Sequence, residues 1–283
     1  MSKKVISLFM MDGEPDGRIK SKIENHSIIV YKIPRNKIDE SKSIDDLNKS
    51  GIYFLIASDD ESEKQIVYVG QGTIKKDDTG IATRATGQHS EGIDDYWGEV
   101  VFLVSGMSNN GIGQTELCYL ENKFYNIIKD SNRVIVKNAK EPTKSPITEE
   151  QECVLQEIID DAKILIGSLG YKFLTTLSKP TSSDILTYVG KKKNSVKARC
   201  QMTNDGFYLL KGSEITDSAV DSCSEKAKRR REEEKKEGNI IDNKITKDLF
   251  FDSPSAIAQF VSGLSESGNT AWENSEHKLL KDM

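Results

Sequence analysis

Residues 51–70 have the sequence GIYFLIASDDESEKQIVYVG, and the predicted fold follows from this segment. Two apolar runs, 51–57 and 65–70, flank a polar, acidic link, and β-branched and aromatic side chains fill both runs without a proline. This pattern predicts two antiparallel strands joined by an exposed hairpin loop. Tyr53 and Tyr68 each lie beside a glycine near a strand end, so both hydroxyl groups could reach one site near the sheet. An ordinary hairpin with two core tyrosines fits the same pattern.

The composition describes a globular chain with a charged surface. It has 283 residues, of which 36% are hydrophobic and 30% are charged, and this length suggests about two domains. No apolar run approaches the roughly 20 residues that span a membrane, so we expect no membrane partner. The four cysteines are far apart and form no CxxC pair, which indicates neither a zinc site nor a disulfide framework. A reducing cytoplasm is the setting that this cysteine usage favours.

Elements on both sides of the hairpin complete the first half of the chain. Residues 1–47 are predicted to form a small α/β leader with strands in VISLFM and HSIIVYKI. The apolar run GEVVFLV at 98–104 predicts a third strand beside the hairpin. A short helix over Ile81–Ala85 would point Arg84 back across the sheet.

The predicted helix in GIGQTELCYLENKFYNIIKD carries a carboxylate on its apolar face. Leu117, Leu120 and Phe124 recur with the helical period and define that face. Glu121 lies on the same face, where a carboxylate is costly unless it is paired, hydrogen-bonded or bound to a metal ion. Glu116 lies near the helix start, where the helix dipole favours a negative charge. We therefore interpret Glu121 as functional and Glu116 as structural.

The triplets GIY at 51–53 and YVG at 68–70, in this order and at this spacing, resemble the signature of the GIY-YIG nucleases. The resemblance covers about residues 48–142. It implies an α+β fold in which the hairpin and a third strand form a small three-stranded antiparallel sheet flanked by helices. It also implies an endonuclease that hydrolyses DNA with a single Mg²⁺ (or Mn²⁺) ion.

The same resemblance implies which residues form the catalytic site. The matching positions are Tyr53, Tyr68, Arg84 and Glu121. Either tyrosine would act as general base, Arg84 would hold the scissile phosphate, and Glu121 would be the metal ligand. His89 follows Arg84 by five residues, where the family often has a histidine about one helical turn on, and Asn138 follows the helix of Glu121. Both are further candidates. Gln71 stands where some members carry a lysine.

The second half of the chain begins with a long helix and a linker. The helix is predicted over Glu149–Leu169, with Val154, Ile158, Ala162 and Leu165 on its buried stripe. It would close a nuclease-like domain at 48–176. Serine, threonine and proline cluster at 177–190, which predicts a domain boundary there.

A C-terminal α+β accessory domain is predicted over 190–283. Its strands would form a hairpin around TNDG at 203–206. LLKGSEI, DSPSAIAQFVSG and the closing tryptophan region resemble an uncharacterised module often found after GIY-YIG domains in bacterial proteins. That resemblance implies context and no chemistry, so the domain could bind DNA or a protein partner.

The predicted nucleic-acid contacts lie at the start of this domain, although the net charge of −5 does not by itself favour a nucleic-acid partner. They are Lys191, Lys192, Lys193, Lys197 and Arg199, with no acidic residue among them. A basic run of this kind fits phosphate tracking and also fits a solvated face. An alternative to the endonuclease is a non-catalytic nucleic-acid-binding or adaptor protein that retains the fold.

Overall fold

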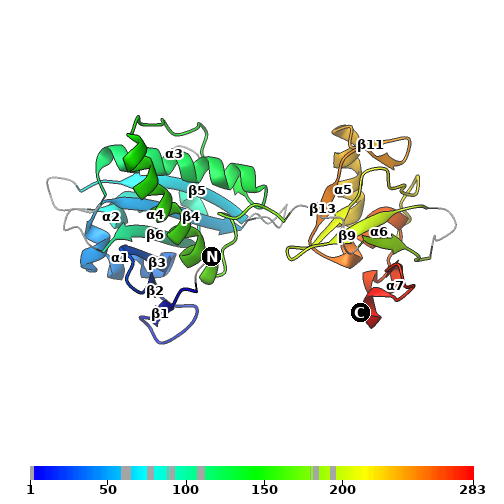
Figure 1. Cartoon of the computed structure of the whole chain (residues 1–283), viewed down its shortest axis with the longest axis horizontal. Coiled ribbons are helices and arrows are strands. Elements are labelled where there is room, and N and C mark those ends of the chain that lie inside the picture. The colour runs from blue at the N-terminus through cyan, green and yellow to red at the C-terminus, as the bar shows by residue number, and fades with distance from the viewer. Residues whose placement is uncertain are drawn as a thin grey trace. The chain divides into compact units, whose positions relative to one another are not determined.

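A computed structural model of the chain describes residues 3–58, 65–74, 80–87, 89, 93–106, 112–178, 180, 185–191 and 196–283. The chain divides into two compact units, Met1–Leu177 and Ser178–Met283 (Figure 1). Each unit combines helices with strands, so the predicted α+β class is confirmed. Within the described ranges, no helix has both the length and the apolar composition needed to cross a membrane.

The first unit is built on one sheet with the strand order β1-β2-β3-β6-β4-β5-β7 (Figure 1). Neighbouring strands are antiparallel except β5 and β7, which are parallel. The bounds are Ile6–Met10 for β1, Ile19–Ile23 for β2, Ile28–Pro34 for β3, Gly51–Ser58 for β4, Gln65–Gly72 for β5, Glu99–Ser105 for β6 and Ile135–Val136 for β7.

The hairpin and the third strand pair as predicted, but the sheet is larger than the three strands expected from the sequence. Strand β6 pairs with β4 on one side and with β3 on the other, along the whole of Ile28–Pro34. Residues 1–47 therefore extend this sheet through β1, β2 and β3, and the compact unit continues across residue 47. The reason is that β6 is apolar along its length and is buried by strands on both of its edges.

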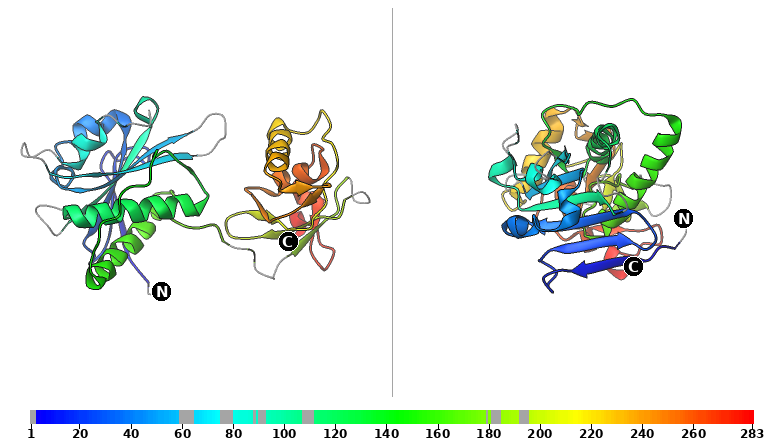
Figure 2. Two further views of the ribbon diagram at one scale, coloured as in Figure 1. Left: turned by 90° about the horizontal axis from the view of Figure 1, so that it is seen from above. Right: turned by 90° about the vertical axis from the view of Figure 1, so that its left-hand side faces the viewer.

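Helices cover both faces of this sheet (Figure 2). α3 (Gln114–Ser131) and α4 (Glu149–Ser168) pack on one face, and α1 (Ile38–Ser41) and α2 (Ile81–Ala85) pack on the other. Alternate side chains of β4 enter the two cores, Phe54 toward α3 and Tyr53 toward α2. A strand buried on both faces has a continuous apolar sequence, which explains the unbroken run of β4.

The long helix α4 packs through a different stripe from the one predicted. Val154 is 60% exposed, whereas Leu155 and Ile159 are buried. The predicted Ala162 and Leu165 are buried as well. Both stripes have helical spacing, and the side chains of the sheet decide which of them is covered.

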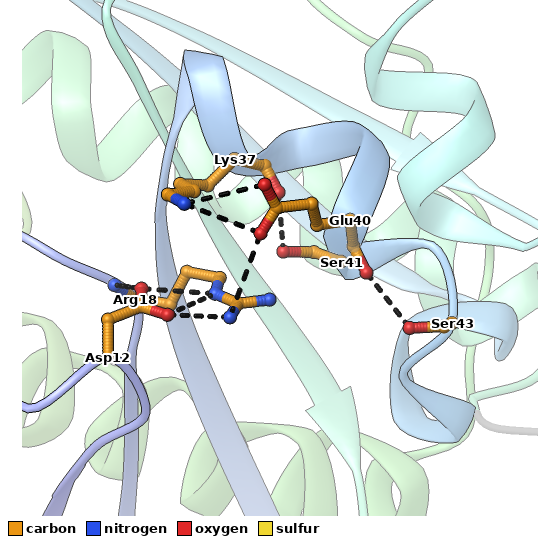
Figure 3. Close-up of polar contacts among 6 residues, drawn as sticks. All are labelled: Asp12, Arg18, Lys37, Glu40, Ser41 and Ser43. Carbon is orange, nitrogen blue, oxygen red and sulfur yellow. Dashed lines mark hydrogen bonds and ion pairs between the residues drawn. The ribbon is translucent and has the colours of Figure 1, made fainter.

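Charged side chains fix the turn between β1 and β2 against α1 (Figure 3). Nη2 of Arg18 lies 2.6 Å from Oδ1 of Asp12 and 4.0 Å from Oε2 of Glu40. The side-chain hydrogen bond from Arg18 is the largest cause that lowers the pKa of Asp12 to about 2. Nζ of Lys37 lies 3.4 Å from Glu40. The β1–β2 hairpin is therefore held in place at this end.

The second unit has an antiparallel sheet with the order β13-β10-β9-β8-β14 and a short hairpin of β11 and β12. The predicted hairpin around 203–206 is confirmed, because β9 pairs with β10 across that turn. The fully buried Trp272 lies in its core. The strand bounds are Ile185–Tyr188 for β8, Arg199–Met202 for β9, Phe207–Leu209 for β10, Ile240–Ile241 for β11, Lys244–Ile245 for β12, Leu249–Phe251 for β13 and Trp272–Glu273 for β14. The helix bounds are Glu225–Lys236 for α5, Pro254–Ser262 for α6 and Gly268–Ala271 for α7.

Candidate active site

Strands β4 and β5 place both tyrosines of the hairpin on the face of the sheet that packs against α2. Tyr53 lies opposite Gly70 in the antiparallel register, and Tyr68 lies opposite Leu55. The two ring centroids are 6.2 Å apart. Tyr53 is fully buried and Tyr68 is half-buried, so Tyr68 is the tyrosine nearer to solvent.

Two glycines of β5 permit this arrangement. A Cβ on Gly70 would collide with the ring and hydroxyl of Tyr53. A Cβ on Gly72 would lie 2.8 Å from Cα of Ile81 and 3.2 Å from Cβ of Arg84, both in α2. Glycine at these positions therefore lets the Tyr53 ring cross β5 and lets α2 pack directly on that strand.

The short helix α2 carries Arg84 to the tyrosines, as predicted from the sequence. Nη1 of Arg84 lies 3.4 Å from Nε2 of His89. Its positive charge also favours the ionised forms of Tyr53 and Glu121. It therefore offsets part of the increase in their pKa values that burial causes. Arg84 is therefore a cation whose charge acts both on Tyr53 in β4 and on Glu121 in α3.

His89 lies in the centre of this group, and its side chain is fully buried. Nε2 is 2.9 Å from the Tyr53 hydroxyl. Nδ1 is hydrogen-bonded to Oδ1 of Asp94, and Oδ2 of Asp94 accepts the backbone N–H of His89 at 2.6 Å. An ionised carboxylate can only accept, so in the neutral imidazole Nδ1 carries the proton and Nε2 accepts from Tyr53.

The pKa shifts of Asp94 and Tyr53 indicate a charged carboxylate and a neutral phenol. Burial raises the pKa of Asp94, but the hydrogen bonds from His89 outweigh it and the net pKa lies below its ordinary value. Burial raises the pKa of Tyr53 far above its ordinary value, and the neighbouring Tyr68, hydrogen-bonded to Tyr53, adds to the increase. At neutral pH Tyr53 is therefore a phenol, and the chain Tyr68–Tyr53–His89–Asp94 ends on a carboxylate.

Helix α3, on the opposite face of the sheet, brings Glu121 to the same end of β5. Nε2 of Gln71 donates to Oε2 of Glu121 at 2.9 Å, and Oε1 of Gln71 accepts from Gln114 at 3.0 Å. Burial raises the pKa of Glu121, and the hydrogen bond from Gln71 and the charge of Arg84 compensate only in part. Glu121 is thus a carboxylate that an additional cation would stabilise.

The site lies where the outer edge of β5 becomes free. β7 pairs only with Ile66 and Val67 of this strand. Two residues farther along β5, the side chain of Asn138 accepts the N–H of Val69 at 3.0 Å and donates to the Val69 carbonyl at 2.8 Å. In the described part of the chain, no strand pairs with the outer edge of β5 beyond this point. Asn138 therefore fixes the strand that carries Tyr68, and both of its polar atoms are used by the backbone.

The residues around Glu121 fit a hard divalent cation that is bound by few protein ligands. Among the described residues, no group of three or more His, Cys, Asp and Glu side chains could hold a metal ion. Mg²⁺ needs no such group, because it is commonly held by one or two carboxylates and keeps several waters. The Glu121 carboxylate would be the protein ligand at this place, because the amide nitrogen of Gln71 faces it and the amide oxygen of Gln71 accepts from Gln114.

The predicted basic segment belongs to the second unit, whereas the other candidate residues belong to the first. Lys191, Lys197 and Arg199 are exposed. Lys191 donates through Nζ to the backbone carbonyl of Ser265 at 3.1 Å. Lys192 and Lys193 lie outside the described residues.

The structure thus gathers Tyr53, Tyr68, Arg84, His89 and Glu121 at one end of β5. Asp94 was missed by the sequence analysis, and Gln71 was noticed only as a departure from the family pattern. The signal for Asp94 is weak, because Asp95 follows it and nothing in the sequence tells the two carboxylates apart. Only the hydrogen bond in the structure shows that Asp94 is the one that faces His89.

Comparison with known proteins adds information on the second unit. A family model described as a domain of unknown function (DUF4357) matches residues 188–283. The part of the predicted resemblance that concerned an uncharacterised C-terminal module is therefore confirmed. No curated protein and no solved structure matches the chain.

Proposed function

We propose that the first unit is a metal-dependent endonuclease of the GIY-YIG type that hydrolyses DNA phosphodiester bonds. The observation that carries the proposal is the convergence of both hairpin tyrosines with Arg84, His89 and Glu121 at the free end of β5. An ordinary core hairpin would not need a buried histidine, an arginine and a carboxylate with a raised pKa beside its tyrosines.

The proton from the attacking water would leave along the hydrogen-bonded chain of the site. Tyr68, the more exposed phenol, takes that proton as it passes its own to Tyr53, and Tyr53 passes its proton to Nε2 of His89. The resulting imidazolium is stabilised by Asp94. This path needs no free phenolate, whose formation the raised pKa of Tyr53 opposes.

Arg84 and Glu121 act on the phosphate. The water oxygen forms a bond to phosphorus, and the bond to the leaving sugar oxygen breaks. Arg84 can donate two hydrogen bonds from its planar guanidinium to the phosphoryl oxygens as negative charge builds on them. Glu121 would hold Mg²⁺ or Mn²⁺, which when bound supplies positive charge to the phosphoryl and leaving oxygens.

The second unit is proposed to act as an accessory domain for DNA or a protein partner. Lys191, Lys197 and Arg199 present exposed side chains that can contact phosphates. We place the activity in the cytoplasm, because the four cysteines form no close CxxC pair.

A nicking assay on supercoiled plasmid, with Mg²⁺ or with EDTA, tests the proposal. We expect relaxed and linear products only with the metal ion, and none from Glu121→Gln. Branched, nicked and linear DNA then show which structure is preferred. If the purified wild type binds DNA but leaves every substrate intact with Mg²⁺ and with Mn²⁺, the non-catalytic alternative replaces the endonuclease.

A further inference from the structure

Strand β1 is an edge strand that carries exposed apolar side chains. It ends the sheet of the first unit and pairs only with β2 among the described strands (Figure 1). Val5 is 68% exposed, Leu8 46%, Phe9 62% and Met10 42%. These four residues lie within six consecutive positions and form most of the exposed large apolar side chains described in this unit.

Sheet edges are normally protected from pairing with other chains by charges, proline, bulges or shortness. The opposite edge of the same sheet follows this rule, because β7 has only two residues. β1 does not follow it, since the run from Val5 to Met11 contains neither a charged residue nor a proline. An edge of this kind is suited to the addition of another strand.

Hydrogen bonds and ion pairs also hold both ends of β1 in place. At its start, Nζ of Lys4 lies 2.9 Å from Oδ1 of Asp161 in α4, and the Val5 carbonyl accepts from Glu24. At its end, the pair of Asp12 and Arg18 fixes the turn (Figure 3). A strand that is ordered before binding loses little conformational entropy when a partner pairs with it.

The free backbone groups of β1 can be assigned from its pairing with β2. The Val5 carbonyl accepts from Glu24, and the Met11 N–H donates to Arg18. Because the direction of backbone groups alternates along a strand, the odd-numbered residues face β2. Ile6, Leu8 and Met10 therefore direct their N–H and C=O groups to the open edge.

We propose that β1 pairs antiparallel with β1 of a second copy of this chain, about a two-fold axis at Leu8. In this register Leu8 pairs with its own symmetry mate, and Ile6 pairs with Met10 of the other copy. All three residues with outward backbone groups are then used. The pairing extends one sheet across both copies. It covers Leu8 with its symmetry mate, Met10 with Ile6 of the other copy and, on the opposite face, Phe9 with the strand of the other copy beside Ser7.

Charge at the two ends of the strand supports a second copy as the occupant. Lys3 and Lys4 precede β1, and Asp12 and Glu14 follow it. Antiparallel pairing places the lysine end of each strand beside the acidic end of the other, which brings Lys3 toward Glu14. Lys4 and Asp12 keep their partners Asp161 and Arg18 within the same chain. A parallel arrangement would place like charges together.

Sedimentation equilibrium of the full chain tests the association. We expect a concentration-dependent dimer for the wild type. Leu8→Lys and Phe9→Lys place charges in the pairing and should weaken it at least about tenfold. Val154→Lys, at a 60% exposed apolar position on α4, is the matched control and should dimerise normally. Circular dichroism confirms that the variants are folded. A wild type that stays monomeric at all concentrations overturns the proposal.

Oxidative cross-linking tests the register on the folded chain. Leu8→Cys places two thiols across the axis, at a Cα separation of about 5.5 Å that a disulfide can bridge. Ser7→Cys is the control, because Ser7 lies opposite Phe9 of the other copy. We expect a cross-linked dimer from Leu8→Cys and only background cross-linking from Ser7→Cys. Equal cross-linking of both variants contradicts the pairing at Leu8.

Discussion

Two partly buried carboxylates of the first unit, Asp46 and Glu121, have opposite pKa shifts. Burial raises the pKa of Asp46, but hydrogen bonds from Tyr31, Lys49 and Lys20 outweigh it and the pKa falls to about 2. Burial also raises the pKa of Glu121. Hydrogen bonds from the side chain and the backbone of Gln71 and the charge of Arg84 offset this only in part, so the pKa stays above its ordinary value.

The two shifts separate a carboxylate that the fold stabilises from one that it does not. Asp46 receives two ammonium groups and a phenol at 2.7–3.1 Å, so its charge is satisfied by the fold itself. The donors to Glu121 that the structure describes are neutral, both from Gln71, and together with the charge of Arg84 they do not offset its burial. Asp46 is therefore stabilised within the fold, and Glu121 is the carboxylate that an added cation would stabilise, as the proposed metal site requires.

The largest effect is expected from Glu121→Gln, which keeps the shape of the side chain and removes its charge. Cleavage should fall by at least about 10³-fold, because a bound divalent cation contributes several kcal/mol of charge stabilisation. The melting temperature of the metal-free protein should hold or rise by about 1–3 °C, since a poorly compensated carboxylate is removed. Nicking rates and thermal melts on the same preparation measure both. A variant that is destabilised and keeps activity in its folded fraction would make Glu121 structural.

Arg84→Ala removes the cation that acts on Glu121 and should be the next largest effect. The rate should fall by a factor that corresponds to about 2–4 kcal/mol, whereas the affinity for DNA should change little. Lysine should restore little activity, because it lacks the planar fork. Single-turnover cleavage and binding measured separately check this. Near-normal turnover by Arg84→Ala would remove the residue from the mechanism.

The variant Asp94→Asn tests whether a carboxylate that is already hydrogen-bonded within the fold can also take part in catalysis. Asp94→Asn can donate to Nδ1 of His89 and so shifts the imidazole to the tautomer that cannot accept from Tyr53. We expect a loss of roughly 10²-fold in cleavage, in the range of general acid–base catalysis. The matched control is Asp95→Asn, at the exposed carboxylate next to it.

Nitrogen-15 spectra of His89 provide a readout that does not depend on cleavage. The wild type and Asp95→Asn should show the proton on Nδ1, and Asp94→Asn should show it on Nε2. A wild-type imidazole protonated only on Nε2 would contradict the hydrogen-bond assignment, whatever the activity.

The smallest effect on activity is expected from Asp46→Asn, whose effect is on stability. The free energy of unfolding should fall by about 1–3 kcal/mol, because hydrogen bonds to a charged acceptor are lost. The folded protein should cleave normally. Chemical denaturation and nicking rates measure the two effects, and Asp39→Asn, at an 86% exposed side chain, is the control.

The pH dependence of stability separates the two carboxylates. The folded pKa of Asp46 is lowered, so its stabilisation is complete above the unfolded value of about 3.9 and is lost as pH falls through about 2. The folded pKa of Glu121 is raised, so its cost appears as pH rises through that pKa. Wild type and Glu121→Gln should therefore converge in stability at low pH, and wild type and Asp46→Asn should do so only in strong acid.

Much of the local structure followed from the sequence. The alternation and β-branching of 51–70 predicted β4 and β5, and the period of α3 placed Glu121 among apolar residues. These are short-range patterns, in which side-chain spacing alone determines the element. The position of Arg84 on a short helix was predicted in the same way.

The packing partners of α4 and β3 followed only from the three-dimensional structure. The sequence alone determined that α4 is amphipathic, but two stripes had the helical period and only the sheet selected Leu155 over Val154. It determined that β3 is apolar, but only the pairing with β6 made residues 1–47 part of the main sheet. The contact of His89 with Asp94 follows no helical or strand period, and Gln71 meets Glu121 across 50 positions. Such contacts depend on the three-dimensional course of the chain, which residue periodicity does not contain.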